Sequence, residues 1–272
     1  MEKVTEKSSI YNNLEKKTVL ELISYINKED QKVALAIQNV LPSIEQLITS
    51  AEKLLKIGGR FFYLGAGTGG RLSVLDKVEL PNTYGIEKGI FNCLLAGGEE
   101  RLLDVLEEME DSEEDAIRQL KLYGVNSRDF VFGISASGTT PFVLAGLKWC
   151  KENGVSCGCL VNNYKTPIAE NSDYPIEVVM GPEFVTGSTR MKCGTSQKMI
   201  LDMLSTTLLI RLGRVKGNKM VNARLINNKV IDRSVRMLME ESGITDYEVA
   251  RSLVVEFKST NKALEYLLNK NR

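Results

Sequence analysis

Apolar and polar positions along this chain follow two alternating patterns. Five short, nearly continuous apolar segments are typical of strands buried on both faces of a sheet. The segments between these strands space their apolar residues three and four apart, which predicts amphipathic helices, notably over 99–122 and 140–153. Strands that alternate with helices predict an α/β fold, in which helices cover both faces of a mostly parallel five-stranded sheet. The strand segments are 59–65, 91–98, 128–135, 155–163 and 174–181.

Helices are also expected before and after this alternating region. Residues 14–57 carry helical spacing that breaks near Pro42, and 192–212 have the pattern of one long helix. The tail predicts two or three short helices, separated by Gly243 and by the Ser-Thr-Asn run that begins at Ser259. We therefore expect three parts, which are an N-terminal helical segment (1–56), an α/β domain (57–220) and a small C-terminal helical segment (221–272).

Two of the predicted strands run directly into small-residue loops, GAGTGGR after 59–65 and SASGTTP after 128–135. Each loop precedes a helix, so free N–H groups and the partial positive charge of a helix N-terminus favour an anion such as phosphate. A helix N-cap needs only one hydroxyl, and the second loop has four. Both loops are expected at the carboxyl edge of a parallel sheet, where ligands bind. The hydroxyl groups belong to Thr68, Ser135, Ser137, Thr139 and Thr140. This pattern predicts a site for a sugar phosphate.

The first loop also matches the G-x-G-x-x-G pattern of dinucleotide-binding proteins through Gly65, Gly67 and Gly70. Arg71 follows at once, and no acidic residue clearly ends the next strand, so a nucleotide site is the weaker interpretation. Glycines that serve only a tight turn are a second alternative for this loop.

A third polar cluster precedes the predicted long helix, in the stretch GPEFVTGSTRMKCGTSQK over 181–198. Its glycines, hydroxyls and cations again lead into a helix, as in the two loops. Glu183 is a candidate for a hydrogen bond to a sugar hydroxyl. An ordinary loop with a capping box is the alternative.

Composition restricts the chemistry. Lysine plus arginine and aspartate plus glutamate both total 35, so no net field attracts nucleic acid or an anionic membrane. No apolar run approaches the ~18 residues of a membrane span, and the charged N-terminus lacks a signal-peptide core, so a cytoplasmic location is expected. The five cysteines are expected to be reduced and packed. The chain has no histidine, which excludes a Ser-His-Asp triad and His-ligated zinc.

Without histidine, a general acid or base has to be a carboxylate, lysine, tyrosine or cysteine. Most of the acidic residues between 104 and 115 are expected on the solvated face of a helix, so their pattern singles out none of them. Glu79 differs because it follows the first glycine-rich loop by about two helical turns. It stands near Pro81, where a helix is expected to end or bend and to return this carboxylate over the pocket.

With these residues identified, the sequence resembles the N-acetylmuramic acid 6-phosphate etherases, a branch of the sugar isomerase (SIS) domain proteins related to glucokinase regulatory protein. The resemblance extends over about 18–237 and is most specific in LGAGTGGRLSVLDKVELPNT and GPEFVTGSTRMK…GTSQK. It implies a SIS-type three-layer α/β/α fold and a homodimer with pockets near the subunit interface. It also implies a reaction without a metal or redox cofactor.

The resemblance further implies a lyase that frees D-lactate from the sugar phosphate, leaving N-acetylglucosamine 6-phosphate, in peptidoglycan recycling. Carried over by motif, Glu79 is the acid toward the departing oxygen and Glu110 is the base that removes the C2 proton. The expected contacts to the phosphate and sugar are Gly67, Thr68, Gly69, Arg71, Ser135, Ser137, Gly138, Thr140, Glu183, Ser188 and Lys192.

Several pocket positions differ from the family pattern. Gly69 replaces a family serine, which removes one expected phosphate donor, and Ser73 replaces a glycine. Lys77 and Asn82 change the surroundings of the proposed acid. These differences leave two alternatives on the same scaffold, a non-catalytic sugar-phosphate sensor and an aldose-ketose isomerase. A nicotinamide-dependent enzyme is a more distant one.

Overall fold

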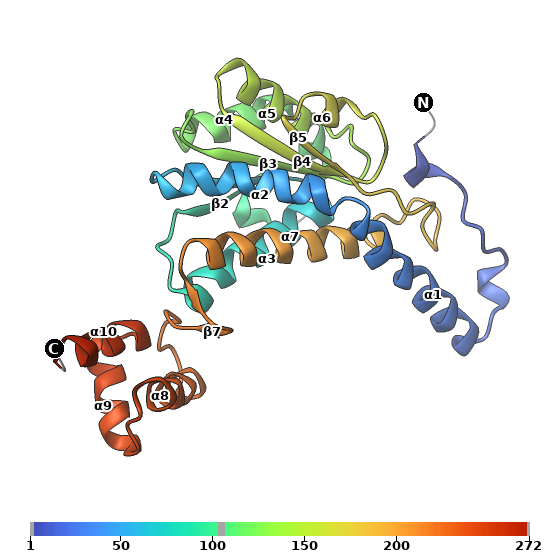
Figure 1. Cartoon of the computed structure of the whole chain (residues 1–272). Coiled ribbons are helices and arrows are strands. Elements are labelled where there is room, and N and C mark those ends of the chain that lie inside the picture. The colour runs from blue at the N-terminus through green and yellow to red at the C-terminus, as the bar shows by residue number, and fades with distance from the viewer. Residues whose placement is uncertain (1–2, 103–106, 271–272) are drawn as a thin grey trace. The chain divides into compact units, whose positions relative to one another are not determined.

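The computed structural model describes residues 3–102 and 107–270 (Figure 1). The five predicted strands form one sheet in the order β2-β1-β3-β4-β5, and every neighbouring pair is parallel. The predicted α/β fold with a five-stranded parallel sheet is therefore confirmed. The strands are β1 (Phe61–Gly65), β2 (Phe91–Leu95), β3 (Phe130–Ser135), β4 (Ser156–Val161) and β5 (Tyr174–Glu177).

Alternating residues of the central strands supply two separate faces of packing. Phe62 and Leu64 belong to a buried apolar cluster that also includes residues of α4 (Glu113–Leu122), α5 (Pro141–Glu152) and α6 (Pro167–Glu170). On the opposite face Phe61 stacks on Phe130 with ring centroids 5.5 Å apart. Both faces are apolar because helices exclude water from both, which explains the continuous apolar runs in the sequence.

Two helices precede the sheet, as predicted from residues 14–57. α1 (Val19–Gln38) begins with a capping box in which Thr18 and Glu21 satisfy each other's backbone N–H groups. α2 (Leu41–Lys56) begins immediately before Pro42, where the missing N–H of proline costs no hydrogen bond. Short 3₁₀ turns, η1 (Val4–Glu6) and η2 (Leu14–Lys16), precede α1.

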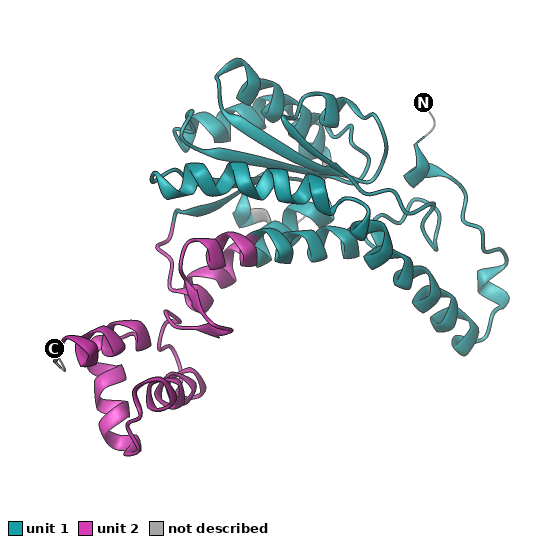
Figure 2. Ribbon diagram, in the orientation of Figure 1, with its two compact units in different colours: residues 1–76, 89–204 teal, residues 77–88, 205–272 magenta. Residues whose placement is uncertain are grey.

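The chain divides into two compact units (Figure 2). Unit 1 comprises Met1–Asp76 and Gly89–Leu204 and contains the sheet, whereas unit 2 comprises Lys77–Lys88 and Ser205–Arg272. Two helices contribute residues to both units, namely α3 (Gly67–Tyr84) and α7 (Lys192–Arg211).

Unit 2 has its own small hydrophobic core. Val235, Leu238, Ala250 and Val254 are buried in it together with residues of the last helix. The predicted short helices of the tail are confirmed, and Gly243 ends the first of them with a φ of 75°. These helices are α8 (Asn228–Ser242), α9 (Tyr247–Phe257) and α10 (Thr260–Lys270), and a two-stranded ribbon precedes them, β6 (Val215–Lys216) with β7 (Lys219–Met220).

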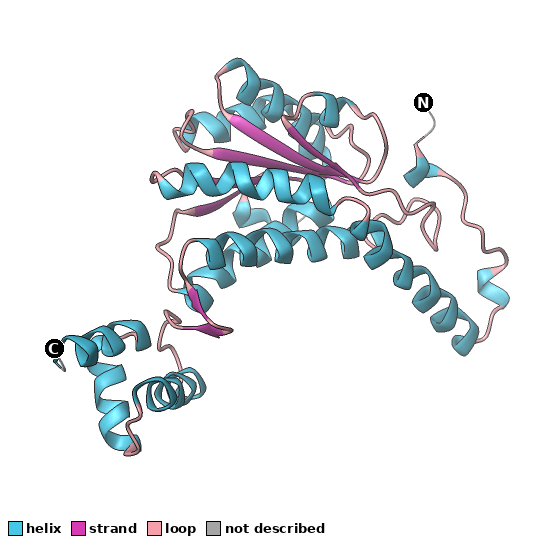
Figure 3. Cartoon of the chain, in the orientation of Figure 1, coloured by secondary structure: helices cyan, strands magenta, loops and turns pink. Residues whose placement is uncertain are grey.

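One sequence expectation about helices is wrong (Figure 3). The single helix predicted over 99–122 is instead η3 (Glu99–Arg101), η4 (Glu107–Asp111) and α4, and the part of the prediction that falls on 103–106 lies outside the described residues. α4 starts afresh because the Ser112 side chain accepts the N–H of Asp115 as an N-cap. Of the two outcomes expected at Pro81, an end or a bend, the structure excludes the end, since α3 continues to Tyr84.

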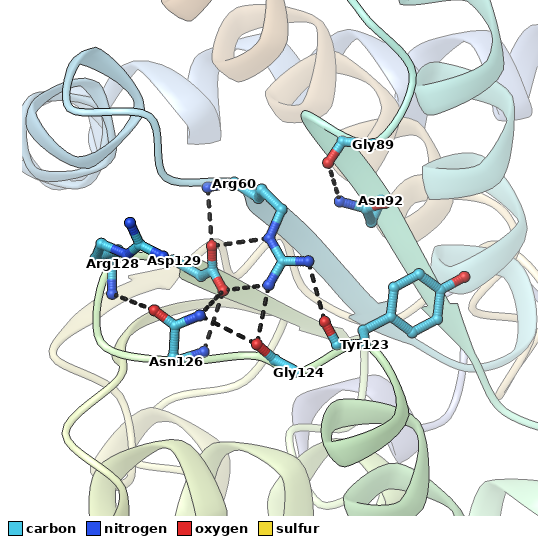
Figure 4. A network of polar contacts seen from close by, with 8 residues as sticks. All are labelled: Arg60, Gly89, Asn92, Tyr123, Gly124, Asn126, Arg128 and Asp129. Atoms are coloured by element: carbon cyan, nitrogen blue, oxygen red, sulfur yellow. Dashed lines mark hydrogen bonds and ion pairs between the residues drawn. The ribbon is translucent and has the colours of Figure 1, made fainter.

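A polar network fixes the amino ends of the central strands (Figure 4). The Asp129 carboxylate is 2% exposed and accepts from the Arg60 backbone N–H, Nε and Nη2, with Nη2 to Oδ2 at 2.7 Å. The Arg60 guanidinium also donates to the carbonyls of Tyr123 and Gly124, and Asn126 donates to Asp129. This network holds the strands at the edge opposite to the glycine-rich loops.

All five cysteines are buried and free, so the expected packing of the thiols is confirmed. Burial raises the pKa of Cys157 and of Cys159 to about 12, so both stay protonated near neutrality. Within the described ranges, no helix combines the length and the apolar character that crossing a bilayer requires.

Candidate active site

The strand order places a crevice between the loops that follow β1 and β3. β1 and β3 are neighbours, but β1 leads through α3 to β2 on one side whereas β3 leads to β4 on the other. At such a switch point the two loops diverge, and open α/β sheets bind ligands there. A cavity of about 190 Å³ lies at this point, lined by residues of both loops. The location predicted from the two glycine-rich loops is therefore the location of this cavity.

The first loop contributes the start of α3 to the cavity. Ala66, Gly67, Thr68 and Gly69 line it, so N–H groups of the first helical turn lie at its wall. Gly67 has a φ of 53°, and a Cβ on it would lie 2.8 Å from Oε1 of Glu110. Position 67 thus requires glycine for two reasons, its backbone conformation and the close approach of a carboxylate.

The second loop contributes a cluster of hydroxyls. Ser135, Ser137 and Thr140 line the cavity, and Ser135 Oγ lies 2.8 Å from Thr140 Oγ1 and 3.3 Å from Ser137 Oγ. α5 begins at Pro141 as predicted, and its N-cap Thr140 makes no side-chain capping hydrogen bond. Thr140 is therefore not used to cap the helix, whereas Ser135 Oγ and Ser137 Oγ accept the N–H groups of Gly138 and Thr139 within the loop. A hydroxyl donates as well as accepts, so this cluster can still direct O–H groups toward an anionic ligand.

Gly138 shapes this loop and does not line the cavity. Its φ is 73°, and a Cβ on it would lie 2.3 Å from Cγ2 of Thr166, so no other residue fits without displacing the loop. Its N–H donates to Ser135 Oγ over 3.1 Å. Arg71 does not line the cavity either, and its Nε donates to the Leu102 carbonyl at 3.4 Å.

The cluster before α7 divides into cavity residues and structural ones. Gly187 and Thr189 line the cavity, with Ser188 between them in the chain. Glu183 is 1% exposed, and its two carboxylate oxygens accept the N–H groups of Lys192 and Cys193, each at 2.9 Å. A carboxylate that satisfies the first N–H groups of α7 stabilises that helix start. Glu183 thus caps α7 from nine residues upstream, which is not the capping box of the alternative interpretation.

Lys192 is buried in an ion pair that links α7 to α1. Its Nζ lies 2.7 Å from Oε2 of Glu29, and the two side chains are 2% and 3% exposed. Burial alone would raise the pKa of Glu29, but hydrogen bonds from Lys192, Lys32 and Tyr11 outweigh it and lower this pKa to about 2. The structure therefore gives Lys192 a partner within the protein.

Glutamates occur in both units. Glu110 of η4 lines the cavity, which lies within unit 1, whereas Glu79 lies in the part of α3 that belongs to unit 2, where it is exposed. Glu6 of η1 also lines the cavity and was not anticipated from the sequence. Its segment is held there by Asn163, whose Oδ1 accepts the N–H groups of Val4 and Thr5 at 2.7 and 3.3 Å.

Two further cavity residues, Thr189 and Gln197, were not predicted individually. Both lie in the GPEFVTGSTRMKCGTSQK stretch, whose density of small polar residues was the available signal. Nothing comparable marks Glu6, because its contact with the cavity depends on long-range hydrogen bonds to Asn163.

Comparison with known proteins agrees with this architecture. Residues 33–151 match the glucokinase regulatory protein N-terminal SIS domain, and residues 100–207 match the SIS domain. Among solved structures, a phosphoheptose isomerase from Francisella tularensis superposes with a TM-score of 0.56 at 16% identity, over 71% of this chain and 98% of that one. A phosphoheptose isomerase from Neisseria gonorrhoeae gives a TM-score of 0.53 at 14% identity, over 70% and 98%. At these identities the likeness concerns the fold alone.

Sequence relatives are much closer. A protein named N-acetylmuramic acid 6-phosphate etherase from Porphyromonas gingivalis is 49% identical over 99% of this chain and 98% of its own. A protein of the same name from Geobacillus is 42% identical over 88% and 81%. Identity at this level along nearly the whole length confirms the resemblance seen in the motifs. The chain belongs to the N-acetylmuramic acid 6-phosphate etherase family.

Proposed function

We propose that this chain cleaves the D-lactyl ether of N-acetylmuramic acid 6-phosphate, releasing D-lactate and N-acetylglucosamine 6-phosphate in peptidoglycan recycling. The observation that carries the proposal is the composition of one small cavity, in which hydroxyl and backbone N–H donors share the wall with the carboxylate of Glu110. Donors suit a phosphate, and a carboxylate suits the removal of a proton from carbon. Membership of the etherase family indicates the substrate.

The two loops bind the phosphate in this proposal. Its oxygens accept from the hydroxyls of Thr68, Ser135, Ser137 and Thr140 and from N–H groups in the first turn of α3. The partial positive charge at this helix start favours the dianion over neutral solutes. Because several elements converge on one group, the sugar is held in a fixed orientation beside Glu110.

Glu110 acts as the base and Glu79 as the acid. Glu110 takes the C2 proton, which the open-chain aldehyde at C1 acidifies. The electron pair of that C–H bond forms a C2=C3 double bond while the C3–O bond breaks. Glu79 gives a proton to the departing lactate oxygen. Water then adds its hydroxyl to C3 and a proton to C2, so that the net reaction consumes one water.

The experiment is a D-lactate assay with purified protein and N-acetylmuramic acid 6-phosphate. Wild type is expected to release lactate, and Glu110→Gln is expected to lower kcat by about 10²–10⁴-fold, the usual contribution of a general base. Glu108→Gln is the matched control because Glu108 is an exposed neighbour in the same 3₁₀ turn. No lactate from wild type would refute the proposal and favour a sensor, whereas sugar-phosphate isomerisation without lactate would favour an isomerase.

Running the reaction in D₂O distinguishes the role of Glu79 from that of Glu110. Glu79→Gln should still exchange the C2 proton, because the base remains, but should release little lactate. Glu110→Gln should do neither. Glu87→Gln, an exposed position in the same unit as Glu79, serves as the control. If Glu79→Gln released lactate at the wild-type rate, Glu79 would not be the acid.

We further propose that the protein acts as a homodimer in the cytoplasm. The family resemblance supports this assignment. Light scattering coupled to gel filtration measures the assembly, and a mass of one chain, 30.3 kDa, would contradict it.

A further inference from the structure

Gln197 of α7 has an unusual position in the wall of the cavity. Its side chain is 2% exposed and lines the cavity, yet its carbonyl oxygen Oε1 has no hydrogen-bond partner in the described part of the chain. A buried acceptor without a donor costs free energy, so natural proteins rarely keep one without a use.

Hydrogen bonds behind the cavity fix which end of the Gln197 amide faces the ligand. Asn162 Nδ2 donates to the Val178 carbonyl at 2.9 Å and to Ser196 Oγ at 3.0 Å. The Asn162 side chain therefore presents its oxygen to Gln197, whose Nε2 donates to it at 3.4 Å. Turning the Gln197 amide over would place two carbonyl oxygens against each other.

The surroundings of Oε1 show where it points. A Cβ on Gly69 would lie 3.1 Å from Oε1 and 2.7 Å from Cγ2 of Ile134, and all three residues line the cavity. Position 69 therefore has no room for a side chain, and glycine lets the Oε1 acceptor and the Ile134 methyl group lie close against the loop backbone at the cavity wall. We call Gly69, Ile134 and Gln197 together the Gln197 subsite.

The chemistry of this subsite differs from that of the hydroxyl cluster. A phosphate dianion has only acceptors and would be repelled by an acceptor. A sugar ring combines apolar C–H groups with O–H or amide N–H donors, which fit an aliphatic wall beside an acceptor. The phosphate thus belongs with Ser135, Ser137 and Thr140, and the sugar belongs with Gln197.

We infer that Gln197 is a specificity-determining residue that accepts a hydrogen bond from a hydroxyl or amide N–H of the sugar. The inference rests on the proposed function, because it takes the cavity to be the sugar-phosphate site. It predicts that Gln197 distinguishes a sugar phosphate from phosphate alone. The proposed catalytic glutamates are not involved in this discrimination.

The test is calorimetric titration of wild type and Gln197→Met with N-acetylglucosamine 6-phosphate and with inorganic phosphate. Methionine preserves the length and volume of the side chain but has no strong acceptor. The Kd for the sugar phosphate is expected to rise at least tenfold, and the Kd for phosphate to stay within twofold. Gln31→Met, at an exposed position of α1, is the control and should leave both Kd values unchanged.

An unchanged Kd for the sugar phosphate in Gln197→Met would overturn the inference, as would an equal loss for both ligands. Titration with 2-deoxyglucose 6-phosphate distinguishes the donors. If Gln197→Met and wild type bind this ligand with the same Kd, the donor is the acetamido N–H. If the Kd of the variant is still at least tenfold higher, the donor is a ring hydroxyl. Failure of the proposed function is seen separately, in wild type itself, as an absence of sugar-phosphate binding and lactate release.

A second measurement needs no variant and so does not depend on how Gln197→Met folds. In a crystal structure of wild type with N-acetylglucosamine 6-phosphate, a sugar O–H or N–H should lie within about 3.2 Å of Gln197 Oε1. A water molecule in that place, or the phosphate group itself, would overturn the inference.

Discussion

Replacing Lys192 by methionine tests whether this lysine stabilises the fold or binds substrate. The variant removes one partner of a buried ion pair and leaves the Glu29 carboxylate, 3% exposed, with Lys32 and Tyr11. Losing one member of a buried pair typically costs about 3–5 kcal/mol. The pKa of Glu29 is lowered from 4.5 to about 2, a net effect on the order of 3 kcal/mol that remains after the opposing cost of burial. Because Lys32 and Tyr11 remain as partners of Glu29, we expect a loss at or just below the lower limit of that range, about 2–3 kcal/mol.

The assay is urea and thermal unfolding of Lys192→Met followed by circular dichroism. A loss of about 2–3 kcal/mol should lower the Tm by roughly 5–10 °C in a chain of this size. Lys198→Met is the matched control on the same helix, since its pair with Asp202 is exposed and should be worth less than about 1 kcal/mol. The double variant Glu29→Gln/Lys192→Met should recover part of the loss, because no unpaired charge then remains buried.

The opposite result would refute this reasoning. If Lys192 binds the phosphate, as the family resemblance implied, Lys192→Met should raise the Kd for a sugar phosphate at least tenfold and leave the Tm unchanged. An unfolding free energy within about 0.5 kcal/mol of wild type would show that the buried pair contributes nothing measurable.

Three other expectations concern the proposed base Glu110, the stability of the fold at low pH and one loop glycine. Glu110→Gln should abolish C2 proton exchange in D₂O as measured by NMR, while its Tm stays near that of wild type. Acid unfolding should reflect Glu29: its folded-state pKa lies below the unfolded value, so its stabilisation is present above about pH 4.5 and disappears as the pH falls toward 2, which unfolding curves at each pH measure. Gly138→Ala should lower the Tm more than Gly154→Ala, because both have positive φ but only Gly138 has no room for a Cβ.

The sheet was predictable because its signal is local and repeated. The central strands β1 and β3 are buried on both faces, so their apolar runs are continuous, and the loop after each contains the glycines that a strand-to-helix turn requires. The segment 99–122 was not predictable in this way. Its apolar spacing suits a helix throughout, but Ser112 caps a new helix inside it, and a cap is weak evidence against a long periodic pattern.

The candidate site was predictable to different degrees for the same reason. The hydroxyls of Ser135, Ser137 and Thr140 lie close together in the sequence, so their density predicts a site without knowledge of the fold. The composition of 181–198 could not separate residues that line the cavity from those that cap α7. Glu183 and Thr189 belong to the same polar run, yet only the tertiary structure buries the first against N–H groups and places the second at the cavity.

Gln197 shows why the remaining part of the site requires a structure. Glutamine in a helix has no preference that distinguishes a ligand contact from an ordinary surface residue. Its assignment depends on a hydrogen bond to Asn162, 35 positions away in the chain, and on its closeness to Gly69. The same glycine that removes an expected phosphate donor also lets the Gln197 carbonyl lie against the loop with no side chain between them. A sequence difference that counts as a loss for the phosphate is therefore, within the folded cavity, a change in how the sugar is recognised.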